Sequence, residues 1–307
     1  MSTIEKALAK QKLAEQEKKK NQQVESETLQ EKSFSASSTP VDAEARVQQV
    51  ETRPSNTSEK SVTIPLDTMD QQGYVSLSSN RKLINEELRA IKRKVIRNAF
   101  GGLAKTLQAS NLITVTSTRP GEGKSFTAIN LALSIALEQD KTVLLVDADV
   151  LKPSISKKFQ VEDSVDAGLM EFLLEEVNDV TDIMYKTNID NLRFIPAGRP
   201  SHLSTELLAS EKMALLAEEF VKRYPDRIVI MDAPPLLGIN ETAVLANLAG
   251  QILIVVEEEK THLGELKQAV EQLDQEKAIG FVMNKAKKQD STTGYGYGYA
   301  YAYASEK

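Results

Sequence analysis

The sequence predicts an α/β fold built on a doubly wound parallel sheet, within residues 81–286 of the 307-residue chain. Short apolar runs alternate there with segments whose apolar residues recur at helical spacing. Strands of this kind, separated by helices, are typical of a parallel sheet covered on both faces. A glycine-rich loop follows the first run, and aspartates follow two others. Because parallel strands end at one edge, the pattern predicts a ligand site there.

The expected elements follow from the spacing of apolar residues. An amphipathic helix comes first, because Leu88, Ile91 and Val95 recur at helical spacing. The expected strands are 112–116, 142–146, 192–195, 227–231, 251–256 and 278–283. The expected helices between them are 124–138, 167–176, 205–223, 241–248 and 261–275.

Three further segments flank this domain. Residues 1–20 carry six lysines against three glutamates and a thin apolar stripe, which predicts a short basic amphipathic helix. That helix either stays solvated or docks on a partner or an anionic membrane surface. Residues 21–80 have too little apolar surface to offset the entropy of ordering, so we expect a disordered linker. Residues 287–307 form a flexible tyrosine-rich tail.

Composition narrows the classes of protein that this chain can be. With no cysteine, disulfides and thiolate metal sites are excluded, and a reducing compartment is the simplest setting. Two histidines and a formal net charge of -6 argue against an imidazole metal site and against general nucleic-acid binding. No run approaches the ~20 apolar residues of a spanning helix. We therefore expect a cytoplasmic protein that a partner can recruit to the inner face of the membrane.

The glycine-rich loop has the composition of a phosphate-binding P-loop. Residues 117–125 read Ser-Thr-Arg-Pro-Gly-Glu-Gly-Lys-Ser, and Thr118 takes the place of the glycine that opens the general pattern. Lys124 would place a positive charge beside the phosphates, and the Ser125 hydroxyl would bind Mg²⁺. The phosphates of ATP are expected to contact seven consecutive residues: Pro120, Gly121, Glu122, Gly123, Lys124, Ser125 and Phe126.

Acidic side chains stand at the ends of two further expected strands. Asp147 and Asp149 follow the run at 142–146, and Asp232 follows the run at 227–231. One such aspartate is usually a helix cap or turn residue, but two acidic strand ends beside a P-loop favour a catalytic role shared with Lys124. We expect Asp232 to hold Mg²⁺ through water, and Asp147 or Asp149 to join the metal shell or accept a hydroxyl proton.

Five of the eight tyrosines lie within nine residues near the end of the sequence. They alternate with glycine or alanine, at Tyr295, Tyr297, Tyr299, Tyr301 and Tyr303. Small neighbours leave each ring free to enter a cleft, so this segment is expected to present phosphoacceptor hydroxyls. A sticky low-complexity tail is the alternative, although glycine weakens the edge strand that such a tail would form.

Together these motifs resemble the Walker A, A′ and B motifs of bacterial tyrosine kinases. The loop at 120–125, the Asp147-x-Asp149 pair and the strand end Asp232-x-Pro234-Pro235 carry the resemblance. The similarity spans residues 81–303 and is greatest to the exosortase-associated tyrosine autokinases of exopolysaccharide gene clusters. It implies ATP and Mg²⁺ as cofactors, and a ring-forming homo-oligomer in which one subunit phosphorylates the tail of another.

The resemblance also implies partners and further site residues. The family's E-x-x-R-x-x-R oligomerisation motif appears as Glu86, Arg89 and Lys92, and Leu151 stands where many relatives have arginine. Asn284 follows the last expected strand, where related P-loop ATPases contact adenine; an ordinary turn is the alternative. A separate transmembrane polysaccharide co-polymerase would activate the kinase, and a tyrosine phosphatase would reverse its reaction.

Two other functions are compatible with a P-loop domain. A positioning ATPase of the MinD or ParA type would not need the tyrosine tail, and it usually carries a lysine where Arg119 stands. A regulatory scaffold for polysaccharide export would bind ATP without useful catalysis, and sequence does not separate it from a kinase. DNA is not the expected partner, although Arg89, Arg93 and Arg97 leave nonspecific DNA binding as an alternative.

Overall fold

The computed structural model describes residues 60–75, 83–223 and 225–287. The helix predicted at 1–20, most of the linker predicted at 21–80 and the tyrosine tail lie outside these residues. Among the described helices, none combines the length and the apolar character that crossing a membrane requires.

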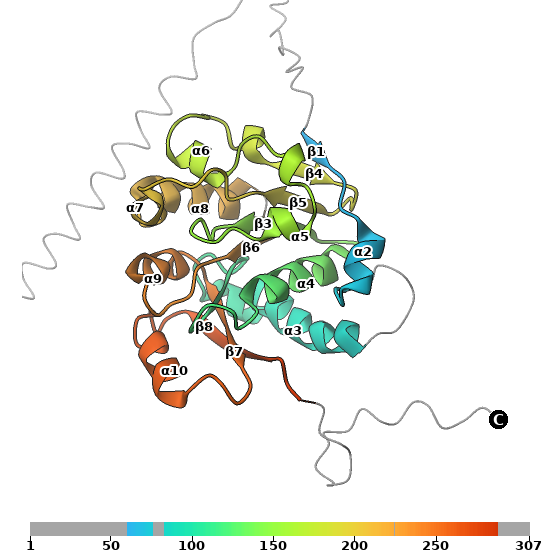
Figure 1. Ribbon diagram of the computed structural model, residues 1–307. Coiled ribbons are helices and arrows are strands. Elements are labelled where there is room, and N and C mark those ends of the chain that lie inside the picture. Colours follow the sequence, from blue (N-terminus) through green and yellow to red (C-terminus); the bar gives the residue numbers. More distant parts are fainter. Residues whose placement is uncertain (1–59, 76–82, 224, 288–307) are drawn as a thin grey trace, which may run out of the picture. The chain divides into compact units, whose positions relative to one another are not determined.

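One sheet runs through the described part of the chain, with its strands in the order β1-β4-β5-β3-β6-β2-β7-β8 (Figure 1). Neighbouring strands are parallel except for β4 and β5, which are antiparallel. The strands are β1 (Ser61–Val62), β2 (Leu112–Ser117), β3 (Thr142–Asp147), β4 (Tyr185–Thr187), β5 (Leu192–Ile195), β6 (Arg227–Asp232), β7 (Gln251–Glu257) and β8 (Ala278–Asn284). The predicted parallel α/β sheet is confirmed, and the short antiparallel β4 is an addition to it.

Helices connect these strands and pack on the sheet. They are α2 (Leu66–Gln71), α3 (Leu83–Phe100), α4 (Lys124–Ala136), α5 (Ile155–Lys158), α6 (Leu169–Leu173), α7 (Ser204–Leu208), α8 (Glu211–Arg223), α9 (Asn240–Asn247) and α10 (Leu263–Val270). The helices predicted between the strands lie where they were expected. The segment at 205–223 is divided, however, because α7 ends before α8 begins.

Alternate residues of the central strands contribute to different hydrophobic clusters. On β2, Ile113 and Val115 belong to a cluster with α3 and α4, whereas Leu112 belongs to a cluster with α6 and α8. A third cluster joins β7 to α9 and α10. Burial of both faces explains why the strands are continuously apolar, and burial of α4 on nearly all sides explains its apolar sequence.

The linker prediction is wrong for residues 60–75. This segment forms β1, which pairs in parallel with β4, and α2. Ile64 and Met69 are 1% and 2% exposed, and both belong to the cluster that contains α4. The Val75 N–H donates to the Asn130 side chain on α4 (2.6 Å). The segment has few apolar residues, but a sheet edge and a helix face supply a partner for each of them. Composition does not reveal that compensation.

The same segment supports the start of α4. Tyr74 is 4% exposed, and its ring packs on Phe126 with ring centroids 5.1 Å apart. Because Phe126 directly follows Ser125, the ordered segment 60–75 stabilises the helix that begins at the predicted phosphate loop.

Replacing Ile64 with alanine should lower the free energy of unfolding by about 2–5 kcal/mol, because the buried side chain would leave a cavity. Urea denaturation of the full chain, followed by circular dichroism, measures the change. Leu263→Ala is the matched control: Leu263 is 81% exposed, so the effect should stay within about 0.5 kcal/mol. Equally small effects from the two substitutions would show that residues 60–75 do not pack on the domain.

Candidate active site

Two glycines allow the loop between β2 and α4 to adopt its backbone conformation. Gly121 and Gly123 have φ values of 91° and 103°, in the left-handed region that other residues enter with strain. A Cβ on Gly123 would also lie 1.9 Å from Asn284 Nδ2, so no side chain fits there. The helix α4 begins at Lys124, and the free N–H groups of its first turn are the natural partners of an anion. This loop has the geometry of a phosphate-binding site.

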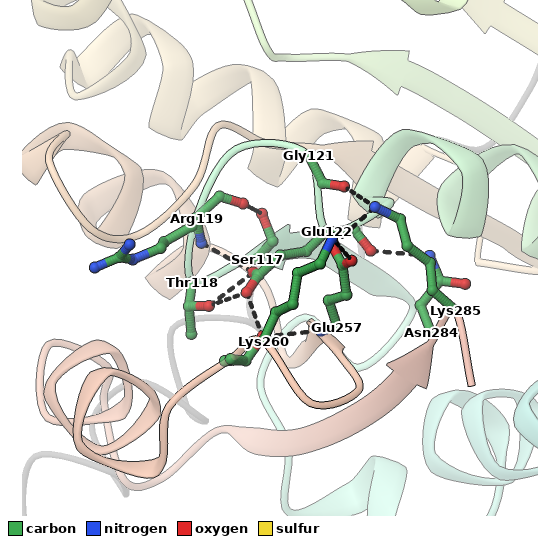
Figure 2. Close-up of polar contacts among 10 residues, drawn as sticks. Ser117, Thr118, Arg119, Gly121, Glu122, Glu257, Lys260, Asn284 and Lys285 are labelled. Atoms are coloured by element: carbon green, nitrogen blue, oxygen red, sulfur yellow. Dashed lines mark hydrogen bonds and ion pairs between the residues drawn. The ribbon is translucent and has the colours of Figure 1, made fainter. Parts of the chain in front are cut away.

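Glu122 closes the loop with its side chain (Figure 2). The carboxylate accepts hydrogen bonds from the Thr118 hydroxyl (2.6 Å), the Arg119 N–H (2.9 Å) and the Thr261 hydroxyl (2.5 Å). Thr118, which replaces the usual glycine, is thus a partner of Glu122. Glu122 is 5% exposed and does not line the cleft beside the loop. Of the predicted phosphate contacts, Glu122 can therefore offer its backbone but not its side chain.

The end of β8 braces the loop from a second side (Figure 2). Asn284 Nδ2 donates to the Glu122 carbonyl (2.8 Å). Lys285 Nζ donates to the Gly121 carbonyl and to the Glu257 carboxylate, both at 2.8 Å. The amide nitrogen of Asn284 is therefore used on the loop itself, and its contact with adenine stays a prediction.

The predicted aspartates meet Lys124 at the carboxyl edge of the sheet. Asp147 and Asp232 are paired in register on β3 and β6, and both are fully buried. Lys124 Nζ lies 2.5 Å from Asp149 Oδ2 and 3.4 Å from Asp232 Oδ1. The Ser125 hydroxyl lies 3.3 Å from the same amine. Residues that are far apart in the sequence, and were predicted for catalysis and metal binding, thus form one cluster.

Burial dominates the electrostatics of this cluster. It raises the pKa of Asp147 to about 7, and the neighbouring Asp232 carboxylate adds to the rise. Two backbone N–H groups at the start of α5 donate to Asp147 (3.0 and 3.1 Å) and offset part of it. Burial also raises the pKa of Asp232, against the attraction of Lys124. Burial disfavours the charged form of Lys124, but the carboxylates of Asp232 and Asp149 outweigh it and raise the pKa of the amine. The cluster therefore favours added positive charge.

Two buried carboxylate oxygens of the cluster fit a metal ion. Asp147 Oδ1 and Asp232 Oδ2 have no hydrogen-bond partner within the described residues, which is unfavourable unless a ligand completes them. The described residues contain no group of three or more His, Cys, Asp or Glu that could hold a metal. Mg²⁺ does not require one, because it usually keeps waters and phosphate oxygens beside one or two carboxylates. Asp147, Asp232 and the Ser125 hydroxyl fit Mg²⁺ that arrives with a nucleotide.

A cleft of about 530 Å³ opens beside the loop. Part of its lining is the loop itself, together with Asp149 and the start of α4. The remaining lining includes several apolar residues that the sequence analysis did not count among the site residues: Leu151, Pro235, Leu237 and Ile239. Leu151 is 45% exposed. In the sequence, the one signal of an apolar subsite is this leucine between Asp149 and Lys152.

The three contact residues predicted on α3 differ in their surroundings. Glu86 and Arg89 form an exposed ion pair with each other (2.9 Å). Lys92 is 8% exposed, and its amine donates to the Ser134 carbonyl (3.1 Å) and pairs with Glu138 (2.5 Å). This side chain joins α3 to the end of α4 within one chain, and its part in a subunit contact stays a prediction. For Glu86 and Arg89 a subunit contact stays a prediction.

Comparison with known proteins identifies the family to which this chain belongs. Residues 110–281 match the family model of the AAA domain. EpsB of Ralstonia nicotianae, named among the tyrosine-protein kinases, is 35% identical over 164 residues. Those residues are 53% of this chain but 21% of EpsB, so the chain spans about a fifth of that relative's length.

Two further relatives match over most of their own length. The tyrosine-protein kinase YwqD of Bacillus subtilis is 32% identical over 228 residues, which are 73% of this chain and 91% of YwqD. The kinase domain of the Escherichia coli tyrosine kinase ETK shares 26% identity with a TM-score of 0.60, over 78% of this chain and 93% of that domain. The chain therefore belongs to the bacterial tyrosine-protein kinases, the family that its three motifs resemble.

Proposed function

We propose that this chain is a tyrosine autokinase that transfers the γ-phosphoryl group of ATP to the tail tyrosines, residues 295–303, of another copy of itself. The observation that supports the proposal is the composition of one cleft. Lys124, Ser125 and Asp149 line it together with the phosphate loop, and apolar side chains complete the lining. A phosphate site beside an apolar surface suits a triphosphate and an aromatic ring.

The residues on the phosphate side divide the proposed reaction between them. Loop N–H groups and Lys124 hold the triphosphate, and Mg²⁺ held by Asp147 and Asp232 supplies charge neutralisation when bound. The tyrosine oxygen forms a bond to the γ-phosphorus as the bond to the β–γ bridging oxygen breaks, and ADP leaves. The phenol proton passes to the Asp149 carboxylate. Among the three aspartates we assign this role to Asp149, because it alone lines the cleft.

The apolar side of the cleft suits the acceptor. Leu151, Leu237 and Ile239 would bury part of a tyrosine ring, and each 100 Å² of apolar surface removed from water contributes about 2.5 kcal/mol. Glycine and alanine neighbours in the tail add no bulk to obstruct such an entry. A positioning ATPase would not need these acceptor tyrosines, which favours the kinase over that alternative.

The cellular role that we propose is control of exopolysaccharide synthesis and export. In this proposal the chain acts in the cytoplasm and is recruited to the membrane by a separate transmembrane co-polymerase that activates it. A tyrosine phosphatase returns the tail to its acceptor state. Each added phosphate brings about -1.5 to -2 charge, so phosphorylated tails would repel one another and loosen a ring.

Lys124→Met should abolish labelling of the chain by γ-labelled ATP, because the substitution removes the cation that contacts the phosphates. Incorporation of label into purified full-length protein measures the effect. Lys222→Met is the matched control, since Lys222 is an exposed lysine on α8 and its loss should leave labelling unchanged. Thermal unfolding of both variants separates a lost contact from a lost fold. A folded Lys124→Met protein that still labels itself fully would contradict the site.

Transfer between subunits predicts labelling in a mixture of two defective proteins. The Lys124→Met protein keeps its tyrosines, and a protein with all five tail tyrosines changed to Phe keeps its phosphate loop. Mixed with Mg²⁺ and ATP, the pair should place phosphate on the first protein's tail, at a rate that rises with concentration. Mass spectrometry locates the phosphate.

A further substitution tests assembly. Glu86→Ala with Arg89→Ala in both proteins should slow this transfer and leave ATP affinity nearly unchanged. An unlabelled mixture, with wild-type labelling independent of concentration, would mean that transfer occurs within one chain.

A further inference from the structure

The helix α3 carries a row of arginines that the proposed chemistry does not use. Arg89, Arg93 and Arg97 follow one another at intervals of four residues, which places them on one side of the helix. With Ile96, Lys92 and Glu138 they line a groove of about 420 Å³. Its lining therefore holds four positive groups and one negative group. Such a surface fits an anion.

The side chains of Arg93 and Arg97 are available to pair with a bound anion. Lys92 and Glu138 neutralise each other, and Arg89 is paired with Glu86. Arg93 and Arg97 are exposed, and their guanidinium groups have no hydrogen bond or ion pair with any residue that the structure describes. The exposed pair of Arg89 with Glu86 is of a kind that contributes little, so a stronger anion can displace Glu86.

We propose that the α3 row, Arg89 with Arg93 and Arg97, is the docking site for the phosphorylated tyrosine tail of this chain. The spacing favours this occupant. Residues four apart on an α-helix are about 6 Å apart along the axis. Tyrosines at alternate positions of an extended peptide share one side and lie about 6.6 Å apart. Successive phosphates at residues 295–303 can therefore meet successive arginines.

The chemistry favours phosphotyrosine over a carboxylate. A guanidinium group matches phosphate with two parallel hydrogen bonds, and a phosphate carries about -1.5 to -2 charge where a carboxylate carries one. The unmodified tyrosines carry no such charge, so the tail would dock only after phosphate has been transferred to it.

This inference rests on the proposed function, because the tail must acquire phosphate. As a consequence, the phosphorylated tail, which is the product of the reaction, would control assembly of the subunits. A tail bound along the row would cover Arg89 and compete with the subunit contact predicted there.

The test uses chemically made peptides, so that its outcome does not depend on whether the chain phosphorylates itself. A labelled peptide of residues 293–304 carrying phosphate on all five tyrosines is titrated with the full chain whose own tail tyrosines are changed to Phe. Mg²⁺ and ADP are present at saturation to occupy the nucleotide site, and fluorescence anisotropy gives Kd. We expect the phosphorylated peptide to bind at least about tenfold more tightly than the unmodified one.

Substitutions then locate the site. Arg93→Gln with Arg97→Gln should weaken binding at least about tenfold, because two charge-assisted contacts are lost. Lys94→Gln with Lys105→Gln removes the same charge from exposed residues outside the groove and should change Kd less than about twofold. Arg93→Lys with Arg97→Lys keeps the charge and should give an intermediate Kd. Thermal unfolding checks that all variants fold.

Spacing is tested with two peptides of equal charge. Phosphates at residues 295, 297 and 299 should bind several-fold more tightly than phosphates at 295, 299 and 303. Equal affinity of phosphorylated and unmodified peptides, or equal loss in the arginine and lysine variants, would overturn the proposal. Vesicles of anionic phospholipid provide the competing outcome. If the arginines are required for vesicle binding and not for peptide binding, the row is a membrane contact.

Discussion

Two carboxylates buried side by side determine how the rest of the site is built. Asp147 and Asp232 are paired in register at the ends of β3 and β6, where both are fully buried. Like charges in such a place repel strongly, and desolvation adds to the penalty. Lys124 and the backbone N–H groups at the start of α5 supply the compensation. The loop that carries Lys124 must therefore hold its position against the sheet.

The same constraint connects the position of the Lys124 amine to nucleotide binding. The amine of Lys124 is needed both by the carboxylates and, in the proposed reaction, by phosphate oxygens. If it turns to the phosphates, Asp147 and Asp232 lose part of their compensation. A divalent cation accompanying the nucleotide restores that charge, and two unpartnered carboxylate oxygens can bind it. The phosphates draw Lys124 away from the carboxylates, and the metal ion replaces the lost positive charge. The site therefore favours Mg²⁺·ATP over free ATP as the ligand.

Features that depend on neighbouring residues in the sequence could be predicted, whereas contacts between residues far apart in the sequence could not. The strands and α4 are buried on both sides, and that leaves a local apolar pattern. The acids at strand ends could be brought together because parallel strands end at one edge. The bond from Thr261 to Glu122 joins residues 139 apart, and nothing in either local pattern marks it. The contacts of Lys92 were missed for the same reason, since one partner lies on α4 and the other just after it.

The braces on the loop also orient its phosphate-binding groups. A peptide unit is planar, so its carbonyl and its N–H point in opposite directions. Lys285 holds the Gly121 carbonyl and Asn284 holds the Glu122 carbonyl toward the end of β8. The N–H groups of Glu122 and Gly123 are consequently turned away from β8, free for phosphate oxygens.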